Sequence, residues 1–302
     1  MTITVLVPDE HGVAALAGID GVRAVRYEPG ALPDEAAEAE VLVPGFLTAD
    51  KGSLVAGVPK LRLVQLLTAG AEAWVGTLPE HVMLSTCSGA HGGSTAEWVV
   101  AALLTMFRTM REFEDDRRTQ TWQMQQTETL QGKRVLVIGS GDLGKQLKRR
   151  LDAFDAEVTM VANTAREGVR GVDELPELLP HHDVVALMVP MTPKTRHLAN
   201  ADFLSRMPDG AVLVNAARGP VVDTDALVRE LSAGRIRAAL DVTDPEPLPP
   251  GHPLWTAPGL LLTPHVAGSC TGVHARAYRV IAEQIAQFAR GEEPSNLVRG
   301  DY

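Results

Sequence analysis

Short, continuous apolar runs recur along the first 93 residues and are separated by more polar stretches. They are Ile3–Val7, Val22–Tyr27, Val41–Val43, Leu61–Leu67 and Val82–Ser85. Between them lie turns with Pro or Gly and Ala- and Glu-rich helical stretches such as Pro33–Ala39. Parallel strands that are buried on both faces need such continuous runs, and alternation with helices favours parallel pairing. The pattern therefore predicts a small α/β unit with a parallel sheet.

The same alternation recurs after residue 133. The predicted strands are Val135–Ile138, Glu157–Ala162, Val184–Val189, Ala211–Asn215, Ala238–Val242 and Leu260–Leu262. Glu174–Leu179 and Asp223–Ser232 are the clearer helices between them, and proline positions such as Pro190 and Pro193 end elements. This half of the chain predicts a second unit with a parallel sheet.

A long helix is predicted between the two units. Ser94 resembles an N-cap that is followed by a first-turn acid, Glu97, and the apolar face continues to Phe107. A helix of this type is a natural crossover between two α/β units, with Gly92-Gly93 as a potential hinge.

Two later segments have less specific patterns. The polar stretch Thr119–Thr129, which contains Trp122 and Met124, is either a loop over an active site or part of a subunit interface. Val273 to Ala289 predicts a final amphipathic helix that packs back on the first unit.

A glycine-rich turn follows the Val135–Ile138 run at once. It reads Gly139-Ser140-Gly141-Asp142-Leu143-Gly144, the G-x-G-x-x-G pattern, and apolar residues then recur at helical spacing. In such a turn the first glycine allows the sharp exit from the strand, and the second lets backbone N–H groups approach a pyrophosphate. The third lets helix and strand pack closely. Because a strand and a helix frame the motif, it predicts a dinucleotide site.

The end of the next strand bears on the choice of cofactor. An NAD site places Asp or Glu about 20 residues beyond the glycine loop, where the acid binds the ribose 2′-OH. Here that place holds Asn163 and Thr164, with Arg166 two residues further on. Neutral hydrogen-bonding groups and a guanidinium suit a 2′-phosphate, so NADP(H) is preferred and NAD(H) remains possible.

Composition excludes several classes of protein. The 302 residues carry a net charge of −10, which argues against non-specific nucleic-acid binding and against docking on anionic membranes. The two cysteines, Cys87 and Cys270, are too few for a disulfide framework or a thiolate metal site, and no metal-ligand spacing occurs. The first eight residues lack the basic start of a signal peptide, and no apolar run has the length of a membrane span. A cytoplasmic protein is expected.

Polar residues stand where predicted strands end. Arg218, Glu246 and His265 each follow one of the last three strands, and parallel strand ends converge on the edge that carries the glycine loop. A guanidinium can hold a carboxylate in two parallel hydrogen bonds, and an imidazole can donate or accept a proton near neutrality. A paired Glu246 would favour the protonated imidazole. Reduction of a ketone beside a carboxylate needs these groups and a hydride.

In the first unit, small residues follow the Leu61–Leu67 run. The sequence Leu67-Thr68-Ala69-Gly70-Ala71 lies where Brändén's rule places ligands, beyond the carboxyl end of a parallel strand. Backbone N–H groups on a glycine-containing loop suit an anion, although an ordinary turn between strand and helix would have the same composition.

Three stretches together resemble the signatures of the D-isomer-specific 2-hydroxyacid dehydrogenases. They are Leu187 to Asp225, Leu240 to Pro247 and Leu262 to Gly268. With the glycine loop and Thr95-Ala96-Glu97, the resemblance spreads over most of the chain. It implies two doubly wound parallel-sheet α/β domains, with a Rossmann cofactor domain (94–270) inserted in a flavodoxin-like substrate, or catalytic, domain (1–93 and 271–302). It also implies a homodimer formed largely through the cofactor domain.

The resemblance further implies roles for single residues. Arg218 would orient the substrate carboxylate, helped by backbone N–H groups near Ala69, Gly70 and Ala71, while His265 would be the acid/base and Glu246 its partner. Asp142 and Leu143 would lie along the pyrophosphate and Asp241 at the nicotinamide carboxamide. The expected cofactor-binding residues are Gly139, Ser140, Gly141, Asp142, Leu143, Gly144, Asn163, Thr164, Arg166, Pro190, Thr195, Ala217, Asp241, His265 and Gly268.

The leading hypothesis is an NAD(P)H-dependent reductase of small 2-keto acids such as glyoxylate, hydroxypyruvate or a phenylpyruvate-like compound. One alternative is a dehydrogenase of a one-carbon or phosphorus oxyacid; the related formate dehydrogenases, however, resemble a pattern with Gln in place of Glu246. A second alternative is a nucleotide-sensing regulatory protein on the same fold. The sequence leaves the physiological substrate open.

Overall fold

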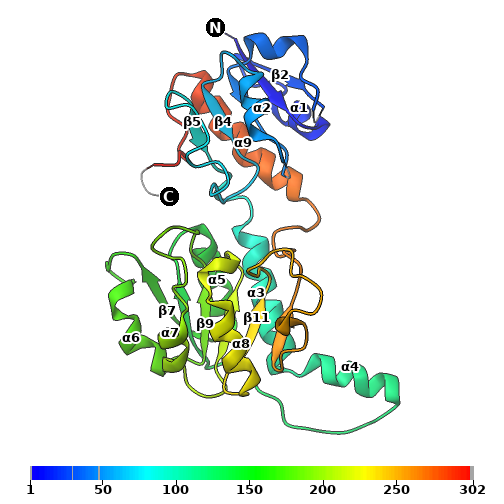
Figure 1. Cartoon of the computed structure of the whole chain (residues 1–302), viewed down its shortest axis with the longest axis vertical. Helices are drawn as coiled ribbons and strands as arrows, with labels where there is room; N and C mark the ends of the chain where they lie inside the picture. The colour runs from blue at the N-terminus through cyan, green and yellow to red at the C-terminus, as the bar shows by residue number, and fades with distance from the viewer. Residues whose placement is uncertain (1, 29, 47, 300–302) are drawn as a thin grey trace. The chain divides into compact units, whose positions relative to one another are not determined.

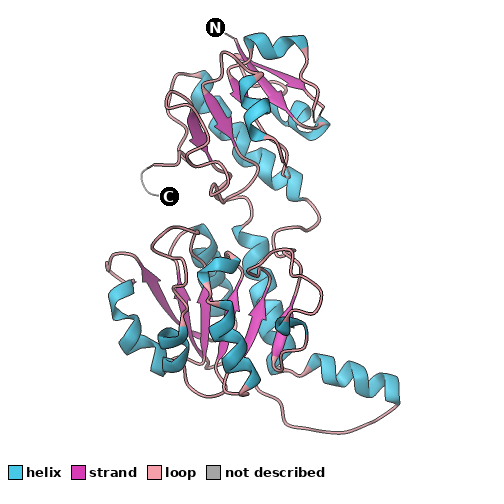
Figure 2. Cartoon of the chain, in the orientation of Figure 1, coloured by secondary structure: helices cyan, strands magenta, loops and turns pink. Residues whose placement is uncertain are grey.

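The computed structural model describes residues 2–28, 30–46 and 48–299. The chain divides into two compact units: unit 1 is Met1–His91 with Thr271–Tyr302, and unit 2 is Gly92–Cys270. The first expected boundary, after residue 93, lies two residues beyond this division, and the second, after residue 270, coincides with it. Figures 1 and 2 show that each unit contains a sheet covered by helices.

Unit 1 is built on a five-stranded parallel sheet in the order β2-β1-β3-β4-β5. The strands are β1 (Ile3–Val7), β2 (Val22–Arg26), β3 (Val41–Leu42), β4 (Leu63–Gln65) and β5 (Met83–Ser85). The order is that of flavodoxin-like folds, and it reverses direction between β1 and β3. Helices α1 (Glu10–Leu16), α2 (Lys51–Ala56) and α9 (Val273–Ala289) and the 3₁₀ helix η1 (Asp34–Glu38) accompany this sheet.

Helix α9 brings the end of the chain back to unit 1. Its residues Ile281, Ile285 and Phe288 are buried in one cluster with Val5 of β1 and Val41 of β3. The prediction that the final amphipathic helix packs on the first unit is therefore confirmed.

Unit 2 is built on a seven-stranded parallel sheet in the order β12-β11-β10-β9-β6-β7-β8. The strands are β6 (Arg134–Ile138), β7 (Glu157–Ala162), β8 (Arg170–Gly171), β9 (Val184–Leu187), β10 (Val212–Asn215), β11 (Arg237–Leu240) and β12 (Leu260–Leu262). The first strand of this unit, β6, lies inside the sheet between β9 and β7, so the order reverses between β6 and β9 as in the Rossmann fold. The predicted fold class, two doubly wound parallel-sheet units, is confirmed.

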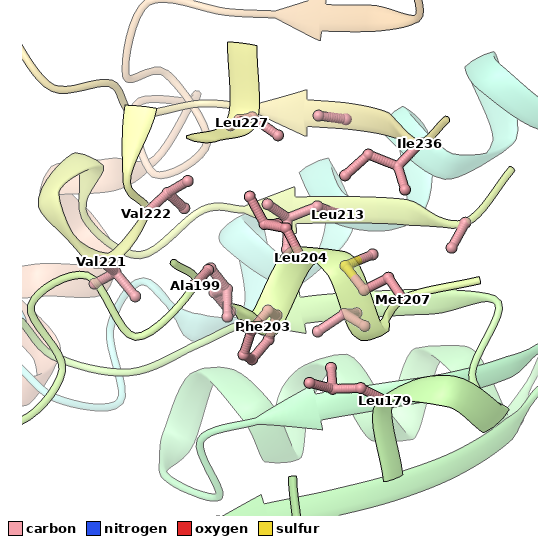
Figure 3. Close-up of a cluster of buried hydrophobic side chains, with 14 of the residues drawn as sticks. Leu179, Ala199, Phe203, Leu204, Met207, Leu213, Val221, Val222, Leu227 and Ile236 are labelled. Atoms are coloured by element: carbon pink, nitrogen blue, oxygen red, sulfur yellow. The ribbon is translucent and has the colours of Figure 1, made fainter. Parts of the chain in front are cut away.

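Alternate residues of each strand of unit 2 enter two different cores, because successive side chains point to opposite faces of a sheet. On one face Leu136 and Ile138 pack with helices α7 (Ala201–Arg206) and α8 (Thr224–Ser232), and Figure 3 shows Phe203 and Leu204 beside Leu213 in this cluster. On the other face Val135 and Val137 pack with α3 (Gly92–Phe107) and α5 (Asp142–Asp152). Continuous apolar strands thus reflect burial on both faces.

Three helix predictions need correction. The long helix α3 begins at Gly92 rather than after an N-cap at Ser94, and a side chain at Gly92 would overlap the Asp142 carboxylate. The segment Glu174–Leu179 is divided among η2 (Val172–Glu174), α6 (Leu175–Leu178) and η3 (Leu179–His181), since Pro176 and Pro180 lack the N–H that a continuous helix needs. The Pro33–Ala39 stretch forms only the short 3₁₀ helix η1.

Candidate active site

The glycine loop lies at the carboxyl end of β6, directly before α5. Gly139 has φ +115°, and a Cβ there would overlap the carbonyl group of Met188 at the end of β9. A Cβ at Gly144 would overlap the carbonyl of Gly139. A Cβ on Gly141, the N-cap, would meet no heavy atom of the described residues within 4 Å, so packing does not explain this glycine. Close approach of a ligand to the backbone would explain the glycine, and the loop fits a dinucleotide pyrophosphate.

The residues after β7 lie beside this loop. Strand β7 is the parallel neighbour of β6, with Ile138 opposite Val161, so both strands end at the same edge. Asn163 and Thr164 are exposed there, and the Arg166 guanidinium donates a hydrogen bond of 2.5 Å to Ser140 Oγ. A cationic group thus lies against the glycine loop at the place where cofactor specificity is expected.

Pro190 and Thr195 form a turn on the other side of the switch point. Strand β9 pairs with β6, with Ile138 opposite Leu187, and the turn follows β9. The Thr195 hydroxyl donates to the Pro190 carbonyl at 2.7 Å and accepts from the Thr192 amide at 2.8 Å. The turn is held by its own side chains at the carboxyl edge of the sheet.

His265 and Glu246 form the central pair of the site. His265 Nδ1 lies 2.5 Å from Glu246 Oε1, and both side chains are partly exposed, by 49% and 39%. They follow β12 and β11, which are parallel neighbours. A cavity of about 390 Å³ opens beside the pair, lined also by Leu248, Trp255 and Thr263. The contact occupies Nδ1 and leaves Nε2 as the other ring nitrogen of His265.

Asp241 holds the loop that carries His265. Its buried carboxylate accepts hydrogen bonds from the Val266 and Ala267 amides, both at 2.9 Å, and from Thr263 Oγ1 at 2.6 Å. The His265 amide donates to the Asp241 carbonyl at 2.7 Å. These bonds hold His265 at φ 54°, a conformation that costs a residue with a side chain roughly 1–2 kcal/mol. Asp241 therefore positions the loop that carries His265, a contact that the sequence did not suggest.

Arg218 stands on a turn after β10. Buried Asn215 holds this turn, with Oδ1 accepting from the Ala217 amide at 3.0 Å and Nδ2 donating to the Arg218 carbonyl at 2.8 Å. A Cβ on Gly219 would overlap the carbonyl of Thr243, so this turn packs directly on the loop that leads to Glu246. Arg218, Glu246 and His265 thus stand at the ends of three neighbouring strands of one sheet.

The structure divides the expected site residues between the two units. The cofactor and catalytic candidates, including Ala217 and Gly268, belong to unit 2, whereas Ala69, Gly70 and Ala71 belong to unit 1. There they follow β4, and Thr68 Oγ1 donates to the Gly70 carbonyl at 2.7 Å. Sequence reasoning missed the anchoring residues Asn215 and Thr263, although a polar residue at the end of an apolar run was a signal for each.

Other features bear on the class of protein. Among residues 2–28, 30–46 and 48–299, no three His, Cys, Asp or Glu side chains are grouped as metal ligands would be. Within the same described ranges, no helix combines the length and apolarity that a membrane crossing requires. Cys87 is buried and Cys270 is exposed.

Comparison with known proteins identifies the family. Residues 100–267 match the family model described as D-isomer specific 2-hydroxyacid dehydrogenase, NAD binding domain. A glyoxylate reductase of Thermofilum pendens is 32% identical over 257 residues, which cover 80% of this chain and 75% of that relative.

Two solved structures are similar over nearly the whole chain. One is a D-isomer specific 2-hydroxyacid dehydrogenase of Xanthobacter autotrophicus Py2 in complex with NADPH and MES, with 32% identity, a TM-score of 0.84, and coverage of 99% of this chain and 98% of that one. The other is an NADPH-dependent glyoxylate/hydroxypyruvate reductase of Sinorhizobium meliloti in complex with NADP and sulfate, with 26% identity, a TM-score of 0.83 and the same coverage. The chain belongs to the D-isomer specific 2-hydroxyacid dehydrogenase family.

Proposed function

We propose that this chain is an NADPH-dependent reductase that converts small 2-keto acids into D-2-hydroxy acids. Membership of the family makes it an NAD(P)-dependent oxidoreductase that acts on CH–OH groups. The observation that carries the finer proposal is the His265 Nδ1–Glu246 Oε1 hydrogen bond of 2.5 Å, at strand ends that neighbour the Arg218 turn. The relatives named as glyoxylate reductases support the substrate class.

In this proposal each residue has one task. The nicotinamide ring would supply the hydride that adds to the keto carbon. Arg218 holds the substrate carboxylate through a two-pronged contact, with the backbone of Ala69–Ala71 as a second contact. His265 donates its Nε2 proton to the oxygen as negative charge develops there, and accepts a proton in the reverse direction. Glu246 keeps the ring oriented, and Asp241 holds the loop.

Two further parts of the proposal concern the cofactor. The guanidinium of Arg166, held at Ser140, supports a 2′-phosphate, and no carboxylate stands at position 163 to repel it. The NADPH and NADP complexes of the two similar structures agree with this preference. The buried Asp241 carboxylate already accepts three hydrogen bonds from its own loop, so any contact with the carboxamide would be additional.

The assembly proposed is a homodimer formed through unit 2. Helix α4 (Met110–Thr119) has no buried residue in the described structure, and Figure 1 shows it projecting from its unit. In the connection that follows, Trp122 and Met124 are 96% and 90% exposed. Exposed large apolar side chains on a projecting segment favour the subunit interface over a loop that covers the site. A chain with only two cysteines has no disulfide framework, which supports a reducing, cytoplasmic location.

Steady-state assays test the proposal. NADPH and NADH consumption is measured with glyoxylate, hydroxypyruvate and phenylpyruvate, and reduction of NADP and NAD is measured with formate and phosphite. We expect turnover of 2-keto acids with NADPH, and a loss of turnover of about a hundredfold or more in Arg218→Lys, because an ammonium cannot make the bidentate contact. Cofactor binding without turnover of any acid would favour a nucleotide sensor and contradict the proposal.

A further inference from the structure

Unit 1 contains a cluster of four aromatic rings that the proposed chemistry does not use. His11 of α1 stacks on His274 of α9, with ring centroids 4.9 Å apart and an interplanar angle of 27°. Phe46, in the loop after β3, meets His274 edge to face at 5.6 Å and His91 at 6.3 Å. We call these four residues the ring cluster. Four chain segments far apart in sequence thus bring their rings together at one place in unit 1.

The ring cluster is connected to the loop proposed to bind the substrate carboxylate. His91 Nε2 hydrogen-bonds to the Leu67 carbonyl at 2.8 Å, and Leu67 stands directly before Thr68–Ala71. Since Phe46 contacts the ring of His91, the cluster starts at this loop and continues to α1 and α9. A substrate whose carboxylate is held at the loop would have its side chain within reach of these rings.

The exposed surface of Phe46 and the charge of Asp9 indicate which kind of substrate side chain fits beside the ring cluster. Phe46 keeps 37% of its surface exposed although its ring touches two imidazoles, so an apolar aromatic surface remains open. Asp9 Oδ2 lies 3.5 Å from His274 Nδ1, and its negative charge would offset one imidazolium and repel a second carboxylate on the substrate. Aromatic pairs gain from offset stacked and edge-to-face contacts, which these ring faces and edges offer.

We propose that the ring cluster is a side-chain subsite for aryl-substituted 2-keto acids, the phenylpyruvate class, in preference to glyoxylate or to dicarboxylic keto acids. The inference rests on the proposed function, because it takes the Thr68–Ala71 loop as the carboxylate site. Phe46 is the specificity-determining residue, and the imidazoles of His91 and His274 hold its ring in place.

Substrate profiles of the wild type and of three variants test this inference. The probes are phenylpyruvate, glyoxylate and oxaloacetate, and the variants are Phe46→Ala, Phe46→Tyr and, as a matched control, Val75→Ala, an exposed apolar residue of the same unit outside the cluster. We expect the wild type to favour phenylpyruvate. In Phe46→Ala, kcat/KM for phenylpyruvate should fall by about tenfold or more, while glyoxylate changes by less than about threefold. Phe46→Tyr should keep the preference, and Val75→Ala should match the wild type.

The outcomes separate this inference from the proposed function. Turnover of glyoxylate together with equal losses for all three acids in Phe46→Ala would overturn the aryl subsite and leave the reductase proposal intact. A wild-type preference for oxaloacetate would also overturn it, in favour of a subsite for a second carboxylate. Failure of the wild type to reduce any 2-keto acid would contradict the proposed function itself.

Discussion

The two units share a doubly wound parallel sheet, yet their switch-point helices begin differently. In unit 1 the helix after β1 is capped by its own sequence, because Asp9 Oδ1 accepts the Gly12 amide at 3.0 Å. In unit 2 the helix after β6 has Gly141 as its N-cap, and no side chain of the described residues caps it. A carboxylate at the N-terminus occupies the place that a phosphate would take, whereas glycine leaves amide groups open. The two cap residues therefore differ in the way that favours phosphate binding at the helix of unit 2.

The largest expected effect is on kcat in a variant of unit 2 that should keep its affinity for NADPH. His265→Asn removes the proposed proton donor but leaves the glycine loop untouched, so kcat should fall by about 10²–10⁴-fold. Stopped-flow or steady-state assays give kcat, and fluorescence titration gives the Kd for NADPH, which should stay near the wild-type value. An unchanged kcat would remove the proton-transfer role of this residue.

The next prediction concerns a variant in which the N-cap of α5 in unit 2 becomes an aspartate, as at the N-cap of α1 in unit 1. In Gly141→Asp a carboxylate would stand where the pyrophosphate is expected, and repulsion should weaken NADPH binding by about a hundredfold. Because Asp is a better N-cap than Gly, the melting temperature should not fall. Calorimetric titration and thermal unfolding measure both quantities. If the affinity for NADPH stayed at the wild-type level, the glycine loop would not be the phosphate site.

A smaller effect is expected at the end of β7. Asn163→Asp restores an acid that can bind the ribose 2′-OH and repel a 2′-phosphate, so the ratio of kcat/KM for NADH to that for NADPH should rise by about tenfold. Asn163→Ala is the control that removes the amide without adding charge. Tighter NADPH binding in the Asp variant would argue against the role of Arg166 as a phosphate ligand.

The reciprocal change in unit 1 should lower stability without changing the affinity for NADPH. Asp9→Ala removes the N-cap of α1 and should lower the free energy of unfolding by about 1 kcal/mol. The Kd for NADPH should not change, because the cofactor site proposed lies in unit 2. Urea unfolding monitored by circular dichroism measures the first quantity. A weaker affinity for NADPH would show that the two helix N-termini are not independent.

The smallest effect concerns a buried imidazole in unit 2. Burial lowers the pKa of His182 from 6.5, and its ring is held by the Leu178 carbonyl and the Thr159 hydroxyl. Below about pH 6.5 the His182 imidazole therefore binds a proton more readily in the unfolded chain than in the folded chain. The free energy of unfolding should decrease as pH falls through that range. In His182→Gln the dependence of unfolding free energy on pH should be flatter. The exposed neighbour His181→Gln, which keeps the buried ring, is the control.

Much of the fold could be predicted because its signals are local. Continuous apolar runs predicted the strands of both sheets except β8, Arg170–Gly171, which contains no apolar run. The glycine pattern predicted the turn between β6 and α5. Helix ends were less predictable. Gly92, the first residue of α3, lies against the Asp142 carboxylate, which is 50 residues away in sequence (142 − 92) and leaves no room for a side chain there.

The sequence by itself determined which residue types stand at the strand ends: Arg218, Glu246 and His265, and the glycines of the loop. Only the tertiary structure decided their partners, such as the Glu246–His265 bond, the anchoring of residues 263–267 by Asp241 and the contact of Arg166 with Ser140. It also gathered the rings of His11, Phe46, His91 and His274. The physical reason is that hydrophobic period and glycine conformation act within a few residues, whereas contacts between loops depend on strand order and register.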